Sequence, residues 1–232
     1  MNTNSIGILA GMGPRSTAPF IDLLVDECQR QYDAKNDIDF PHMLIYSLPT
    51  PFYIDKPIDH NLMKKTIVKG LRELENIGVN FIVMPCNSAH IYFHELESSI
   101  NIPLLNIVDE TIKNLNKKSQ KVTLFATSST YQSEIYQNGI VSSDNTFIFK
   151  EVWQLQINEI IKEIKINKYN DRVSRLWNSL IEDVKKESVD SIIVACTDLN
   201  IILKEESIPL NVIDSSLCLA KATISEYLKL FK

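Results

Sequence analysis

Cysteine is scarce in this chain: there are four among 232 residues, and no two of them form a Cys-x-x-Cys pair. They stand at Cys28, Cys86, Cys196 and Cys218. Such wide spacing is unlike the disulfide framework of a small secreted domain and unlike a typical zinc site. We therefore expect four free thiols and no bound metal. The functional question is which of these thiols lies where a thiolate is useful.

Long apolar runs and an excess of basic residues are also missing. No stretch approaches the roughly 18 unbroken apolar residues of a membrane-spanning helix. The start, MNTNSIGILAGMGP, lacks the basic segment and long apolar run of a signal peptide. The formal net charge of -5 argues against binding to nucleic acid or to an anionic membrane surface. These absences predict a soluble cytoplasmic protein.

Low-complexity linkers are absent as well, and short apolar runs alternate with amphipathic stretches along the whole chain. Residues 17–31 and 61–77 have the apolar spacing of helices that cover a core. The runs that predict strands are 5–11, 42–48, 81–86, 103–109, 121–127, 146–151, 191–196 and 209–214. Continuous apolar strands separated by helices indicate parallel sheets covered on both faces. The expected fold class is α/β.

The chain also repeats itself in three strand-and-loop units that recur in the same order. The stretch IGILAGMG is matched by VTLFATSS, VNFIVMPCNSAH by VDSIIVACTDLN, and INIPLLNIVDET by ESIPLNVIDSS. Three pairs in register indicate two related halves rather than chance. We expect two pseudo-symmetric, doubly wound domains with parallel four-stranded sheets. Residues 1–108 with 214–232 would form the first domain, and residues 109–213 the second.

This repeat places Cys86 and Cys196 at equivalent points, each at the end of an apolar strand. Ligand sites of open α/β sheets lie beyond the carboxyl ends of the strands. The loops GMGPRST, PCNSAH, ATSSTY and ACTDLN begin there. If the two halves face each other about a pseudo-two-fold axis, the loops line one cleft and the two thiols meet across it. A single buried cysteine would be read as a small hydrophobe, but the matched pair favours a function.

Two thiols on opposite sides of a substrate can invert a stereocentre. One, as thiolate, removes a proton from a carbon atom, and the other, as thiol, returns a proton to the opposite face. Neighbouring polar residues could hold an α-carboxylate and so stabilise the carbanion without any cofactor. These residues are Asn87, Ser88 and Thr197 at helix starts, and Thr127, Ser128, Ser129 and Thr130 in the loop that repeats GMGPRST.

The set GILAGMGP, PCNSAH, ATSSTYQSEIY and ACTDL with IPLNVIDSS resembles the aspartate/glutamate racemase family, the amino-acid racemases that need no pyridoxal phosphate. The resemblance covers nearly the whole chain. It implies a homodimer in which Cys86 and Cys196 are the proton donor and acceptor. It also implies an amino-acid substrate surrounded by Met12, Asn87, Ser88, Thr130 and Thr197.

One segment departs from the aspartate racemase pattern. Family members that act on aspartate hold the distal carboxylate partly with an arginine in the loop after the second strand. The matching segment SLPTPFYIDKPIDH contains no arginine, and Lys56 is its only basic residue before His60. The second distal contact of the family, a lysine, is matched by Lys165. Together with PHMLIYSLPTPFYIDKPIDH, ACTDLN and IDSSLCLAK, this departure makes the chain similar to the broad-specificity branch, which implies that non-acidic or basic side chains are accepted.

Some motifs have a plainer interpretation. The loop GMGPRST lacks the third glycine of a nucleotide-binding fingerprint, so we expect a tight turn there. Arg15 in this loop could neutralise a carboxylate or simply be solvated. His90 and His94 have the i, i+4 spacing that can hold zinc, but no third ligand is near in sequence. Packing or a hydrogen bond is the favoured role for these histidines.

Other residues are expected to be structural. Cys28 falls on the apolar face of the helix at 17–31, and Cys218 belongs to the last helix without a loop context. Asp109 and Asp214 follow matched strands, where they could orient site groups or cap helices. Asp198 suits a helix start, although a contact with a cationic amine of the substrate is also open.

Other functions remain open at this point. Aspartate or glutamate racemisation is the nearest alternative to broad specificity. Isomerisation or decarboxylation of small dicarboxylates fits the scaffold, but the two matched cysteines argue against decarboxylation. A non-catalytic amino-acid-binding regulator would keep Asn87 and Thr197 without needing both thiols.

Overall fold

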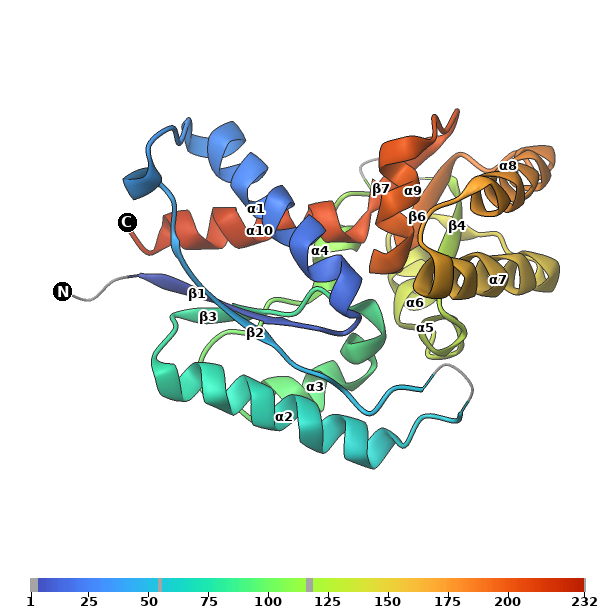
Figure 1. The fold of residues 1–232 in the computed structure, drawn as a ribbon. Coiled ribbons are helices and arrows are strands. Elements are labelled where there is room, and N and C mark those ends of the chain that lie inside the picture. The colour runs from blue at the N-terminus through green and yellow to red at the C-terminus, as the bar shows by residue number, and fades with distance from the viewer. Residues whose placement is uncertain (1–3, 54–55, 116–118, 232) are drawn as a thin grey trace. The chain divides into compact units, whose positions relative to one another are not determined.

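The computed structural model describes residues 4–53, 56–115 and 119–231. The chain divides into two compact units. Unit 1 consists of Met1–Ile107 and Ser216–Lys232, and unit 2 of Val108–Ser215. Each is built from a parallel sheet and helices, so the α/β class is confirmed (Figure 1).

Unit 1 has a three-stranded parallel sheet in the order β2-β1-β3. The strands are β1 (Ser5–Ala10), β2 (His42–Ser47) and β3 (Phe81–Val83). All six residues of β1 are buried, as expected for a central strand covered on both faces. Helices α1 (Thr17–Tyr32) and α10 (Ser215–Lys229) lie on one side of the sheet, and α2 (His60–Ile77) and α3 (Phe93–Glu97) on the other (Figure 1).

The prediction of a fourth strand in this sheet, at residues 103–109, is wrong. The segment makes only an isolated parallel bridge between Leu104 and Ile82, and helix α4 (Ile107–Ile112) begins within it. The bridge consists of two bonds: Ile82 donates to the Pro103 carbonyl, and Leu105 donates to the Ile82 carbonyl. A longer ladder has no partner because β3 ends at Val83, just before Met84 and Pro85, whose ring nitrogen has no hydrogen to donate.

The two helices predicted from apolar spacing are confirmed. Helix α2 begins where the Asp59 side chain accepts a bond from the Leu62 amide, and it ends at Gly78 in the left-handed conformation. Its inner face buries Ile67, Leu71 and Leu74, among other residues, against the sheet. Ile77, in the last turn of the helix, is 63% exposed.

Unit 2 has the predicted four-stranded parallel sheet, in the order β5-β4-β6-β7. Its strands are β4 (Lys121–Ala126), β5 (Thr146–Phe147), β6 (Ser191–Ala195) and β7 (Asn211–Asp214). The predicted run at 146–151 is a strand only over its first two residues, because Lys150 already caps helix α7 (Glu151–Asn167). The remaining helices are α5 (Ser128–Gln132), α6 (Ile135–Ser142), α8 (Asp171–Lys186) and α9 (Asn200–Glu205).

The core of unit 2 is formed where α7 and α8 pack on the sheet. Trp153 from α7 and Trp177 from α8 are each 1% exposed. Trp177 meets Phe125 of β4 edge to face, with ring centroids 5.4 Å apart. Such a contact contributes about 0.5–1.5 kcal/mol beyond simple burial. In the described part of the chain, no helix is both long and apolar enough to cross a membrane.

Candidate active site

Cys86 lies three residues beyond the end of β3, at the start of the 3-10 helix η3 (Asn87–Tyr92). Its backbone is extended, with φ -151° and ψ 104°, and its amide donates to the Met84 carbonyl at 2.7 Å. The thiol residue is half-buried, Asn87 beside it is buried, and Ser88 is half-buried. The strand therefore delivers a partly accessible thiol at the carboxyl end of the sheet of unit 1, where ligands of such sheets bind.

His90 supports this thiol through the backbone. Its Nδ1 lies 2.8 Å from the Cys86 carbonyl oxygen, and its Nε2 lies 3.4 Å from the Leu105 carbonyl oxygen. A carbonyl oxygen can only accept, so the ring nitrogen that bonds the Cys86 carbonyl is a donor. The ring is 2% exposed and stacks on Phe93. The favoured role of His90 in hydrogen bonding is confirmed, whereas His94, exposed one turn later, lies in a different environment.

Met12 lies in the tight turn expected after the first strand. Gly11 has φ +91°, and its amide is 3.3 Å from the Thr17 hydroxyl. Met12 and Cys86 both pack against the same apolar cluster of unit 1, which includes Leu9 and Met84. Two of the predicted site residues are thus brought to one end of one core. Arg15 is exposed.

Cys196 repeats the geometry of Cys86 in unit 2. It directly follows β6 and precedes the 3-10 helix η4 (Thr197–Leu199), with φ -144° and ψ 115°. Its carbonyl accepts a bond from the Leu199 amide at 2.9 Å. Cys196 is 6% exposed and Thr197 is 9% exposed. Both cysteines are therefore extended residues between a buried parallel strand and a 3-10 turn, as the internal repeat predicts.

The hydroxyl residues that follow β4, from Thr127 into the first turn of α5, lie at the same edge of the sheet as Cys196, because β4 and β6 are adjacent parallel strands. The Thr127 hydroxyl oxygen is 3.0 Å from that of Thr130 and 3.1 Å from that of Ser129, and it accepts a bond from the Thr130 amide. Ser128 donates to Asn158 Oδ1 at 3.0 Å. These bonds hold the predicted hydroxyls in fixed orientations, Thr130 being fully buried.

Lys165 on α7 forms an ion pair with Asp198 in η4, with Nζ and Oδ2 2.6 Å apart. The Lys165 side chain is 22% exposed and the Asp198 side chain 7%. Sequence reasoning singled out both residues but missed the pairing, since helix α8 and strand β6 separate them along the chain. Lys56, the other basic residue considered for a distal contact, is exposed and lies 4.8 Å from the ring centroid of Tyr53. Ile54 and Asp55 of that segment lie outside the described residues.

The remaining candidates lie on helices or at the end of a strand. Cys28 and Cys218 are buried, as predicted. Asp109 was expected to follow a strand, but residues 103–109 do not form one. Asp109 is instead an exposed residue of α4. Asp214 is the last residue of β7, directly before α10.

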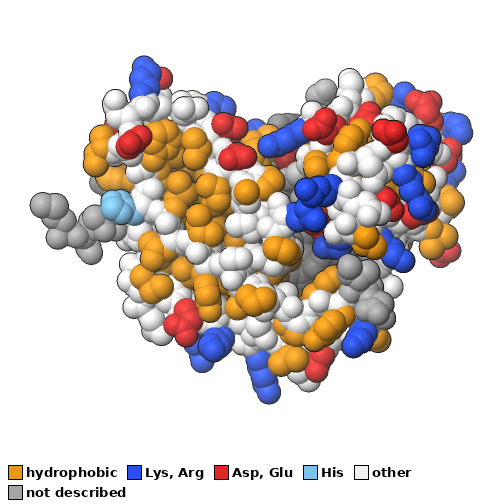
Figure 2. Space-filling view, in the orientation of Figure 1, with side chains coloured by type: hydrophobic (Ala, Val, Ile, Leu, Met, Phe, Trp, Pro, Cys, Tyr) orange, Lys and Arg blue, Asp and Glu red, His pale blue; other side chains and the backbone are white. Residues whose placement is uncertain are grey.

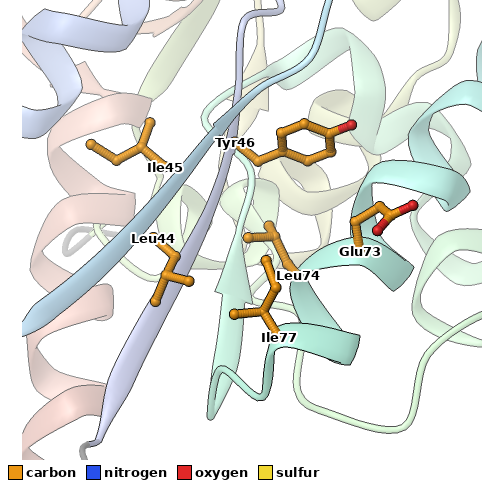
Figure 3. Close-up of a pocket in the computed structure, with 6 residues that line it drawn as sticks. All are labelled: Leu44, Ile45, Tyr46, Glu73, Leu74 and Ile77. Carbon is orange, nitrogen blue, oxygen red and sulfur yellow. The ribbon is translucent and has the colours of Figure 1, made fainter.

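A groove of about 420 Å³ lies away from the predicted site residues, between β2 and α2 (Figure 3). It is lined by Leu44, Ile45, Tyr46, Glu73, Leu74 and Ile77. The lining is mostly aliphatic, and no cysteine contributes to it. It is therefore a feature of the sheet edge and not of the cysteine loops.

Comparison with known families and proteins gives a consistent picture. Residues 9–223 match the family model described as Asp/Glu/Hydantoin racemase. The chain belongs to this family. It is 48% identical over 223 residues to the broad specificity amino-acid racemase RacX of Bacillus subtilis (strain 168), covering 96% of this chain and 98% of that protein.

Solved structures agree in fold. The aspartate racemase of Picrophilus torridus is 29% identical, with a TM-score of 0.79 over 97% of this chain and 94% of its own. An aspartate racemase homologue from Pyrococcus horikoshii OT3 is 20% identical, with a TM-score of 0.78 over 97% of this chain and 100% of its own. At that lower identity the likeness establishes the fold alone.

Proposed function

We propose that this protein interconverts L- and D-amino acids, with broad substrate specificity and without a cofactor. Cys86 and Cys196 are its two acid–base groups. The observation that carries the proposal is the repeated geometry of the two cysteines. Each is an extended residue after a buried parallel strand and before a 3-10 turn. The similarity to RacX of Bacillus subtilis over nearly the full length supports the breadth of specificity.

The proposed reaction needs one thiolate and one thiol. The thiolate takes the α-proton, leaving the electron pair on the α-carbon, and the thiol gives its proton to the opposite face. The product has the inverted configuration, and the two cysteines have exchanged protonation states. A free cysteine has a pKa of about 8.5, so a modest lowering by the site is enough to populate the thiolate near neutral pH.

The carbanion would be stabilised at the substrate's α-carboxylate. Donors already oriented by the protein stabilise developing charge without the cost of reorganising water. The residues proposed to surround the amino acid are Met12, Asn87, Ser88, Thr127, Ser128, Thr130 and Thr197, with Lys165 toward the side chain. Residues 1–108 with 214–232 and residues 109–213 are the two domains that we propose contribute these residues.

The decisive test is exchange of the α-proton with deuterated water, followed by mass spectrometry, in Cys86→Ser and Cys196→Ser variants. Each variant should lose racemisation by at least about a hundredfold, since a hydroxyl is a far weaker acid than a thiol. Exchange of one enantiomer alone could survive, because one thiol remains. Cys28→Ala removes a buried thiol elsewhere and should keep activity. Wild-type rates in both serine variants would contradict the mechanism.

Aspartate or glutamate racemisation is the second candidate, favoured by the likeness to the aspartate racemase of Picrophilus torridus. Chiral chromatography of a full amino-acid panel with ornithine, without added pyridoxal phosphate, separates the two. Activity on aspartate or glutamate alone would favour this candidate. Absence of activity on the whole panel would favour an amino-acid-binding regulator.

A further inference from the structure

We infer that Asp198 determines the side-chain preference of the site by neutralising Lys165, so that acidic amino acids are disfavoured. This inference rests on the proposed function and extends it to a residue that selects the substrate. The ammonium of Lys165 and the carboxylate of Asp198 are 2.6 Å apart. Asp198 is two residues from Cys196 in sequence and lies in the 3-10 turn that this cysteine begins. In the proposed site Lys165 lies toward the side chain of the substrate, so the ion pair brings the Asp198 carboxylate to the same part of the site.

The ion pair of Lys165 and Asp198 is largely shielded from water. The Asp198 side chain is 7% exposed, and the Lys165 side chain is 22% exposed. In two other ion pairs of unit 2, Lys150 with Glu187 and Arg172 with Glu159, both partners are at least 36% exposed. Charges withdrawn from water are screened less, and separating them leaves each one uncompensated. Lys165 and Asp198 thus act as one neutral unit.

A neutral unit responds differently to each class of side chain. A distal carboxylate that approaches Lys165 also meets Asp198, so two carboxylates compete for one ammonium in a poorly hydrated place. An aliphatic side chain demands no change in the pair. A lone lysine at the same point would favour aspartate and glutamate, as cations in sites for dicarboxylates generally do. Asp198 is the group that removes this attraction.

The test is the Asp198→Asn variant, which keeps the shape of the side chain and removes its charge. The ratio of kcat/KM for L-aspartate to that for L-alanine should rise at least about tenfold relative to the wild type. Most of the change should fall in KM for aspartate, because the distal group is remote from the reacting α-carbon. Asp198→Glu can keep the pair and should keep the wild-type ratio.

Two controls tie the effect to Lys165. The double variant Lys165→Gln with Asp198→Asn lacks the Lys165 ammonium, so its ratio should return close to that of the wild type. Glu187→Gln removes the partner of Lys150, at the start of the same helix, and should leave the ratio unchanged. If Asp198→Asn does not fold, Lys165→Gln serves instead. It leaves Asp198 unpaired, and the ratio for L-lysine over L-alanine should rise.

The possible failures are distinguishable. An active Asp198→Asn variant with an unchanged ratio, or an equal change for both substrates, overturns the role of Asp198 and leaves the racemase proposal intact. The same holds for Lys165→Gln if neither ratio moves. A wild type that racemises aspartate as well as alanine also overturns it. A wild type that racemises no amino acid overturns both proposals.

Discussion

At the scale of single residues, the two cysteines share a backbone geometry but differ in their support. The carbonyl of Cys86 is bonded by the buried ring of His90, whereas that of Cys196 is bonded by the amide of Leu199 within the turn. The His90 ring also lies 3.4 Å from the Leu105 carbonyl oxygen, but a neutral imidazole has one N–H and donates to one of the two carbonyls. The buried ring therefore packs between the loop of the first thiol and the segment that follows β3. We regard it as a positioning residue.

Glu27 is a second residue whose neighbours decide a local property, the pKa of its carboxyl group. It lies on α1 with 3% of its surface exposed, and its carboxylate accepts bonds from Arg30 and Gln31. Burial alone would raise the pKa of Glu27, but the bonds from Arg30 and Gln31 outweigh it and hold the pKa below the usual 4.5. Gln31 also donates to the Lys221 carbonyl of α10, so this cluster joins two helices of unit 1.

This lowered pKa predicts a pH dependence of stability. The folded state holds Glu27 as the carboxylate, so the contribution is present above the unfolded-state pKa near 4.5 and is lost as the pH falls through the folded-state pKa. Glu27→Gln should lower the free energy of unfolding at pH 7 and reduce its decline below about pH 4.5. Urea unfolding at several pH values measures both. Asp22→Asn, an exposed position on the same helix, is the control, and an equal response from the two variants would contradict the assignment.

At the scale of elements, the turn after β1 depends on a close approach of two backbones. Gly11 has φ +91°, and a Cβ atom there would stand 2.6 Å from the Leu48 amide nitrogen and 2.7 Å from its carbonyl oxygen. Leu48 is itself bonded to the Ala10 carbonyl at 2.9 Å, which continues the pairing of β1 with β2. The turn that carries Met12 is therefore locked against the end of β2.

Gly11→Ala should accordingly destabilise the protein by more than the conformational penalty alone. Gly78 provides a matched comparison, because its φ is +93° and nothing lies within 4 Å of a Cβ atom built on it. We expect Gly78→Ala to cost about 1 kcal/mol, and Gly11→Ala about 3 kcal/mol, with lower racemase activity as Met12 moves. Thermal and urea unfolding give the two differences. Equal costs would show that the contact with Leu48 is easily relieved.

At the scale of the whole molecule, the edge of the sheet in unit 1 is a candidate surface for association with another chain. β2 is an edge strand, and hydrophobic side chains gather along the face that it shares with α2 (Figures 2 and 3). Ile45 is 48% exposed and Ile77 is 63% exposed, both beside the groove. Unpaired strand edges with apolar side chains favour association with another chain. The homodimer that the family resemblance implies remains a proposal, and this face is the surface we assign to it.

The proposed dimer can be tested by placing charged residues in the proposed interface. Ile45→Glu with Ile77→Glu should shift the protein from dimer to monomer, since a self-complementary contact places each new charge twice in the interface. Sedimentation velocity over a range of concentrations measures the shift. Val141→Glu changes an exposed apolar residue of α6 and should have no effect. A wild type that is monomeric throughout, or a double variant that still dimerises, would contradict the assignment.

Local patterns in the chain were enough to predict the α/β class, the helices α1 and α2 and the two equivalent cysteines. Each rests on residues adjacent in sequence: an apolar run, a helical spacing, or a strand followed at once by cysteine and a small polar residue. The predictions that were wrong also rested on adjacent residues alone. The run at 103–109 looks like a strand, but a strand also needs a partner of matching length, and β3 ends at Val83.

Only the folded chain decided which distant side chains meet. Packing of α7 against η4 brings Lys165 to Asp198, and the path of the chain after β3 brings the Leu105 carbonyl to His90. No periodicity records these contacts, because each depends on how whole elements pack and not on the spacing within one of them. The sequence thus specified the two equivalent cysteines, and the tertiary structure specified which charges and hydrogen-bonding groups meet in the turns that follow them.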